Sequence, residues 1–318
     1  MNTKIIHIVA MCALFAAAGS VRAAAPAPTN GNIVAGDAAK PLDSTWDVAA
    51  DVRIRIDNVR GKVEVTGWDR PQAKLDGSLG AGSTLVIAAG SDKLDLRVKS
   101  ERSGWFGSEG PARDSHLILH VPRGAVLELH VVSADASVGG MAGKSLQAGS
   151  VSGTLDIAST APDLDIDSVS GDVKIAATGL DATAARAHVQ TVSGDIQATG
   201  LAGRIKLETV SGNIRCACGS VRDLDTGTVS GDADVRVNPV ANARLHLESM
   251  SGGIRLHLPA VLSARIDASS FSGDIASDFG KVQEAGHGPG SSMNATVGNG
   301  DARIQVQSFS GDIQLRKQ

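Results

Sequence analysis

The sequence predicts an all-β protein, a single-chain β-solenoid of the β-helix type with an irregular N-terminal β cap. A pentad of the form Val-Ser-Gly-Asp-Ile recurs at steps of about 20 residues, which is typical of a solenoid coil. Apolar and polar residues alternate on both sides of each pentad, as in strands with one buried face. No long segment has the apolar spacing of an amphipathic helix.

The chain begins with the three parts of a secretory signal peptide. Lys4 supplies a basic region, residues 5–18 are apolar, and a segment of small residues ends at Ala23. The apolar run is too short to span a membrane. We therefore expect residues 1–23 to be removed on export. Residues 24–45 are rich in Ala, Pro, Gly and Asn and are expected to form a flexible leader.

Charge and hydropathy narrow the classes of partner. The chain has 30 basic and 34 acidic residues, and loss of Lys4 and Arg22 with the signal peptide leaves 28 basic residues and a net charge of −6. This balance argues against a nucleic-acid partner, which would favour a basic surface. No second apolar stretch is long enough for an integral membrane span. The expected partner is an unknown protein or an envelope polymer.

Residues 46–131 form an N-terminal β region or a set of irregular first coils. Strands are expected at residues 85–87, 94–98 and 117–121, but their spacing is uneven. A loop at residues 103–110 carries Trp105 and Phe106, which makes it a possible interaction loop, because large apolar side chains in insertions often contact partners.

The regular array occupies residues 132–318, with an inserted loop at about 276–300. Glycine is expected to permit a positive φ at each corner, as at Gly212, and the apolar residue before each Ser-Gly pair is expected to stack inside the solenoid. The segment at residues 297–302 looks like a degenerate copy of the corner. The eight corner glycines, predicted as structural turn residues, are Gly153, Gly171, Gly194, Gly212, Gly231, Gly252, Gly273 and Gly311.

The repeats resemble those of the bacterial putative-adhesin family, a domain of unknown function with Val-Ser-Gly-Asp β-strand repeats. Residues 56–63 (IDNVRGKV) resemble the first repeat of that family, residues 120–124 (HVPRG) the segment before its main array, and residues 298–313 its usual end. The resemblance covers residues 46–318. It implies placement in the envelope or at the cell surface and supplies no catalytic residue.

Two groups of carboxylates are candidate chemical sites. The corner aspartates, such as Asp172 and Asp195, are either cation ligands in a ladder or turn residues that bond the nearby backbone. Asp163, Asp165 and Asp167 share one face of a strand, which suits either a glycosidase carboxylate pair or a solvated face.

Cys216 and Cys218 are the two cysteines that would remain after export. They are expected to stay unpaired and buried, since a bridge across one residue would be strained.

The sequence thus predicts a non-enzymatic exported envelope protein with an adhesin-like interaction or structural role. It would act in the periplasm, at the cell surface or after secretion, without catalytic residues, cofactor or metal. Two alternatives remain open: a polysaccharide-acting solenoid enzyme and a cation-dependent binding module.

Overall fold

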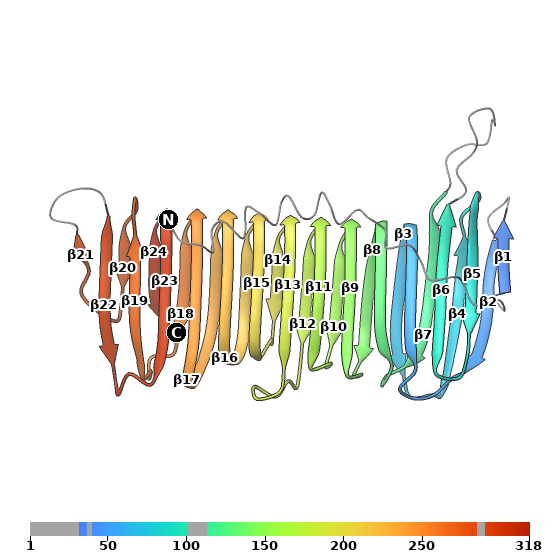
Figure 1. Ribbon diagram of the computed structural model, residues 1–318, viewed down its shortest axis with the longest axis horizontal. Coiled ribbons are helices and arrows are strands. Elements are labelled where there is room, and N and C mark those ends of the chain that lie inside the picture. The colour runs from blue at the N-terminus through green and yellow to red at the C-terminus, as the bar shows by residue number, and fades with distance from the viewer. Residues whose placement is uncertain (1–31, 37–39, 101–112, 285–289) are drawn as a thin grey trace, which may run out of the picture.

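Each coil of the solenoid consists of two strands that meet at a Ser-Gly corner, and successive coils pair in parallel (Figure 1). The computed structural model describes residues 32–36, 40–100, 113–284 and 290–318. The predicted signal peptide and the predicted loop with Trp105 and Phe106 lie outside these residues. Within them the chain is all-β, which confirms the predicted fold class.

The strands on the two sides of the corner form two sheets. The first sheet contains, in spatial order, β6 (Lys93–Ser100), the first half of β3 (Arg53–Trp68), the first half of β8 (Val126–Met141), β9 (Ser145–Ser152), β11 (Asp163–Ser170), β13 (Arg186–Ser193), β15 (Gly203–Ser211), the second half of β16 (Ile214–Ser230), the second half of β17 (Ala233–Ser251), β23 (Ala302–Ser310) and β19 (Ala264–Ser270).

The second sheet is built in the same way from the other half of each coil. Its strands are β7 (Ser115–Pro122), the second halves of β3 and β8, β10 (Leu155–Ser159), β12 (Val173–Ala177), β14 (Ile196–Thr199), the first halves of β16 and β17, β18 (Ile254–Leu258), β24 (Ile313–Lys317) and β20 (Ile275–Ser277).

The inward side chains of both sheets form one continuous apolar core. In β15 the burial pattern alternates strictly, so Ile205 and Leu207 point inward and Lys206 points outward. Ile205 is in register with Ala187 on one side and Leu224 on the other, which stacks apolar residues along the solenoid. Full burial of one Val, Leu or Ile side chain contributes about 1.5–3 kcal/mol, and no single coil can bury its own face.

Most of the corner glycines are required for a different reason from the one predicted. Gly153, Gly231 and Gly252 have positive φ angles, but Gly212 does not. A Cβ atom added to Gly212 would lie 2.0 Å from the carbonyl oxygen of Gly194. The same overlap recurs from coil to coil, because the backbones of successive corners approach too closely for any side chain. Gly212 is therefore needed for close approach and not for a left-handed conformation.

The apolar residue before each Ser-Gly pair points outward, which corrects the predicted internal stack. Counting alternation from Ile205 places Thr209 inside and Val210 outside, and the structure follows this order. Buried hydroxyls occupy the inner positions, and the Ser168 hydroxyl donates to the Gly171 carbonyl at 3.2 Å. The outward residues form an apolar ridge, here defined as Val132, Val151, Val169, Val192, Val210, Val229, Met250, Phe309 and Phe271.

The last coils are stacked out of sequence order. β23 and β24 lie between the coil formed by β17 and β18 and the coil formed by β19 and β20. The stacked rings of Phe309 and Phe271, 5.0 Å apart at their centroids, mark this contact on the apolar ridge. Sequence spacing alone gave no sign of this insertion of the C-terminal coil.

Antiparallel strands cover both ends of the solenoid (Figure 1). At the C-terminal end, β22 (Ser291–Val297) pairs with β19, and β21 (Gln283–Glu284) pairs with β22. The predicted inserted loop at 276–300 thus contains two capping strands. Residues 297–302 form the connection from β22 to β23 and are not a corner, because the chain reverses there with positive φ angles at Gly298 and Gly300.

The N-terminal cap contains β1 (Asn32–Gly36), β2 (Lys40–Asp47), β4 (Gln72–Leu79) and β5 (Ser83–Ala89), which make antiparallel pairs. β1 and most of β2 lie in residues 24–45, the segment predicted to be a flexible leader. Leu42 is buried there, and pairing with β4 supplies the backbone hydrogen bonds of β2. The first regular coil is β3, since it pairs in register with β8 through both sheets.

Cys216 and Cys218 form a disulfide, which corrects the expectation that they stay unpaired. Both side chains lie on the inward face of β16 and are buried. Their Cα atoms are 5.4 Å apart, within the range that a disulfide spans. Residues at positions i and i+2 share a face, so this separation allows a bridge across one residue.

We expect Gly212→Ala to lower the free energy of unfolding by about 1–3 kcal/mol, because the added methyl group forces two coils apart. Gly219→Ala is the matched control in the same part of the chain. Its Cβ would approach no atom closer than 3.6 Å, so its stability should be nearly unchanged. Denaturant unfolding of the two variants measures the difference, and equal midpoints would contradict the close-approach argument.

Candidate functional site

The outer side of the first sheet carries a row of arginines. Arg186, Arg204, Arg244, Arg303 and Arg265 each stand seven residues before the Ser of their corner, and Asp223 occupies the same place in β16. The strand register brings them side by side in the order Arg186, Arg204, Asp223, Arg244, Arg303, Arg265. We call these six positions the arginine row.

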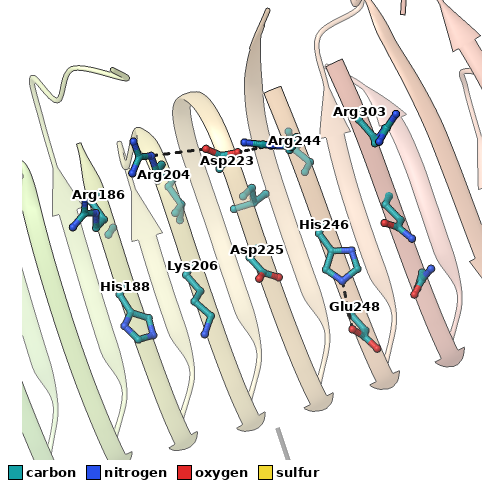
Figure 2. A pocket seen from close by; sticks show the side chains of 16 residues that line it. Arg186, His188, Arg204, Lys206, Asp223, Asp225, Arg244, His246, Glu248 and Arg303 are labelled. Carbon is teal, nitrogen blue, oxygen red and sulfur yellow. Dashed lines mark hydrogen bonds and ion pairs between the residues drawn. The ribbon is translucent and has the colours of Figure 1, made fainter. Parts of the chain in front are cut away.

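Four of these arginines line a hollow on the outer surface, shown in Figure 2. The hollow has a volume of about 830 Å³ and crosses β13, β15, β16, β17 and β23. Below the arginine row, a second row presents His188, Lys206, Asp225 and His246. We call this hollow the basic groove. Its lining residues are Arg186, Ala187, His188, Arg204, Ile205, Lys206, Asp223, Leu224, Asp225, Arg244, Leu245, His246, Glu248, Arg303, Gln305 and Gln307.

The charges in the basic groove are only partly paired. Arg244 donates to Asp223 at 3.0 Å, and Arg204 lies 3.9 Å from the other oxygen of the same carboxylate. His246 lies 3.5 Å from Glu248. Among the described residues, neither Arg186 nor Arg303 has an acidic partner. The lining holds five Lys and Arg residues against three Asp and Glu residues, so the groove is locally positive on a chain of net charge −4.

The same sheet carries a fully different charge pattern near its N-terminal end. Arg55 lies 2.8 Å from Glu128 and 3.2 Å from Asp57, and Arg97 lies 3.4 Å from Asp57. His130 lies 3.3 Å from Asp57 as well. Burial would raise the pKa of Asp57, but its contacts with His130 and Arg55 together lower that pKa below the usual range. These charges satisfy one another, which indicates a structural role.

The corner aspartates act as links between coils. The carboxylate of Asp195 accepts the backbone N–H of Asn213 at 2.8 Å and its side-chain amide at 3.1 Å. In the same way, Asp172 accepts the N–H of Asp195 at 3.0 Å, and Asp232 accepts the N–H of Gly253 at 2.8 Å. Each aspartate thus bonds the backbone of the next coil and not its own turn. No group of three or more His, Cys, Asp or Glu residues in the described part of the chain could hold a metal ion.

The three carboxylates of β11 lie on the outer side of the first sheet, next to the basic groove. His188 lies 3.4 Å from Asp165, and the amide of Gln190 donates to Asp167. Burial raises the pKa of Asp167. Asp163 is exposed and in register with Arg186. Asp165 and Asp167 thus each contact a side chain of β13, whereas Asp163 faces solvent.

The predicted site residues and the basic groove lie in different places. All eight corner glycines lie at the junction of the two sheets, whereas the groove lies on the outer face of the first sheet. The arginine row was not predicted from the sequence. Aligning the coils on their Ser-Gly corners would have revealed it, because the six positions have identical spacing from the corner.

The chain matches one family profile and is similar to two solved structures. The family profile described as Toastrack DUF4097 matches residues 47–316. A crystal structure of a putative cell adhesion protein from Clostridium sporogenes is 14% identical, with a TM-score of 0.23, over 88% of this chain and 100% of that one. A putative adhesin from Bacteroides fragilis is 12% identical, with a TM-score of 0.38, over 87% of this chain and 97% of that one. No curated protein matches significantly. Among the described residues, none forms a helix long and apolar enough to cross a membrane.

We expect Asp195→Ala to lower the free energy of unfolding by about 1 kcal/mol, because the carboxylate that accepts the backbone N–H and the side-chain amide of Asn213 is lost. Asp156→Ala, an exposed carboxylate outside the ladder, should have little effect. Thermal melts with a chelator and with millimolar calcium should coincide. A calcium-dependent rise in melting temperature that disappears in Asp195→Ala would instead support the cation-dependent module.

The lowered pKa of Asp57 predicts a pH dependence of stability. A group whose pKa falls on folding stabilises the protein above its unfolded pKa, about 3.9 for Asp, and that stabilisation is lost as the pH falls through the folded value. We therefore expect the free energy of unfolding to decrease below about pH 4 and Asp57→Asn to flatten this decrease. Denaturant unfolding from pH 7 to pH 2.5 measures the slope, with Asp156→Asn as control. An unchanged slope in Asp57→Asn would contradict the assignment.

Proposed function

Because this chain belongs to the Toastrack DUF4097 family, we propose that it is a non-enzymatic, exported protein of the bacterial envelope that acts by binding, with an adhesin-like interaction or structural role. The observation that carries this proposal is the basic groove on the outer side of five successive strands. Its unpaired arginines, Arg186 and Arg303, lie on a rigid sheet. Binding of a partner therefore costs little conformational entropy in the protein backbone.

Export is supported by the N-terminal sequence. The basic, apolar and small-residue regions of residues 1–23 are those of a signal peptide, and the processed chain would begin at Ala24. The partner is then an envelope polymer or another envelope protein. The same signal peptide is compatible with a final location in the periplasm, at the cell surface or in the medium.

The repeated surface favours binding over turnover. In a solenoid, identical positions of neighbouring coils point the same way, so the side chains form parallel rows and do not converge on one bond. Catalysis needs acid, base and stabilising groups aimed at one reacting centre. The enzyme alternative depends on Asp165 and Asp167, whose carboxylates belong to neighbouring outward positions of a single strand.

We expect the chain lacking residues 1–23 to sediment with isolated envelope material and Gln305→Trp to reduce that binding at least severalfold. Gln305 is exposed in the lining of the basic groove, so an indole there obstructs it whatever the charge of the partner. Gln197→Trp, at an exposed position on the second sheet, is the matched control and should bind like the unaltered chain.

Three results would contradict the proposal. Equal binding by Gln305→Trp, Gln197→Trp and the unaltered chain would show that the basic groove is not the binding surface. Release of reducing ends from a polysaccharide by the unaltered chain, but not by Asp165→Asn, would establish the enzyme alternative. N-terminal sequencing of the exported form should find Ala24, and an intact Met1 on the folded protein would refute export.

A further inference from the structure

We propose that the basic groove binds a linear acidic polysaccharide, with the carboxylates of the polymer on the arginine row and its hydroxyls on the acidic and amide side chains below. This inference rests on the proposed function and names the ligand class of the same site. The polymer would lie along the long axis of the solenoid and cross the strands at right angles.

The first argument is the repeat of the cationic positions. Neighbouring strands of a sheet are about 4.8 Å apart, so the arginine row extends for about 24 Å over its six strands. Arginines at equivalent positions of parallel strands point the same way, so they form a row along the molecule. A linear polymer with an anionic group on each unit can meet arginines on both sides of Asp223, at Arg186 and Arg204 and again at Arg244 and Arg303.

The second argument is that two of these cations lack a partner within the protein. Arg204 and Arg244 share Asp223, whereas Arg186 and Arg303, one at each end of the groove, have no acidic partner among the described residues. In the N-terminal network, by contrast, Arg55 contacts two carboxylates. Guanidinium groups favour bidentate contacts with carboxylates, and these two are free to make them.

The third argument is the composition of the groove below the arginines. Asp225 and Glu248 offer acceptors, and Gln305 and Gln307 offer both donors and acceptors. Sugar hydroxyls donate and accept in the same way, so these side chains match the uncharged part of a polysaccharide. An anionic ligand without hydroxyls would be repelled by the carboxylates of Asp225 and Glu248 and could donate no hydrogen bond to them.

The same composition disfavours nucleic acid and a lipid surface. Single-stranded nucleic acids bind by stacking bases on aromatic rings, and the lining has no aromatic residue except the imidazoles of His188 and His246. Densely spaced phosphates, in a strand or at an anionic membrane, would lie against Asp225 and Glu248. A planar membrane would also fail to reach side chains at the bottom of a hollow.

The test uses the chain lacking residues 1–23 and three linear uronic-acid polymers: polygalacturonate, alginate and hyaluronate. We expect at least one of them to bind in calorimetry at low salt and to weaken as salt is raised, because exposed ionic contacts are screened. Arg186→Gln/Arg303→Gln should weaken binding by about tenfold or more, as loss of charged hydrogen bonds implies. Lys174→Gln/Arg236→Gln removes the same charge from exposed positions of the second sheet and should bind normally.

Each other result overturns the inference in a distinguishable way. Equal weakening by the two double variants would show that only net charge matters. Binding of neutral dextran as tightly as the uronates would show a groove for uncharged sugars, and tighter binding of oligothymidylate or anionic vesicles would identify another ligand class. If no uronate binds while envelope material still does, the ligand class is wrong and the proposed function stands. If neither binds, both are wrong. Matching melting temperatures confirm that the variants are folded.

Discussion

The close approach of backbone at the Ser-Gly corner is the constraint on which the rest of the structure depends. A Cβ at Gly231 would lie 2.0 Å from the Gly212 carbonyl oxygen, and a Cβ at Gly311 would lie 2.1 Å from that of Gly252. Only a chain without side chains at these positions can stack its coils at strand spacing. Once the corners are stacked, the register of both flanking strands follows, and with it the side of the sheet on which each residue lies.

Fixed register turns sequence positions into rows along the molecule. Inward positions become the continuous core, corner aspartates become a chain of links between coils, and outward positions become rows of charge. The same outer face therefore carries two kinds of charge. Near β3, Arg55 and Asp57 belong to a network in which the charged side chains pair with one another. Across β13 to β23, the groove has more Lys and Arg residues than Asp and Glu residues. The first pattern stabilises the first coils, and the second leaves charge available for a ligand.

A stack of parallel coils has two open edges, and exposed strand edges promote association with other chains. This protein covers the C-terminal edge of its first sheet with β22, which runs antiparallel to β19, and its N-terminal edges with the antiparallel strands of the cap. After β22 the chain turns back, and β23 and β24 pair between two coils that precede them in the sequence. The C-terminal strands therefore lie inside the array and not at its end. The apolar ridge runs along the outside of these same corners and ends with the stacked rings of Phe309 and Phe271.

The sequence by itself determined the fold class, the corner positions and the alternation of each strand, because these depend on residues close together in the chain. The outward position of Val210 and the equal spacing of the arginines could also be predicted, by counting residues from the Ser-Gly corner. Only the tertiary structure decided which coil neighbours which, since pairing joins segments far apart in sequence and the long step before Gly311 fits several partners. The place of Arg303 between Arg244 and Arg265, and hence the length of the basic groove, follows from that non-local pairing.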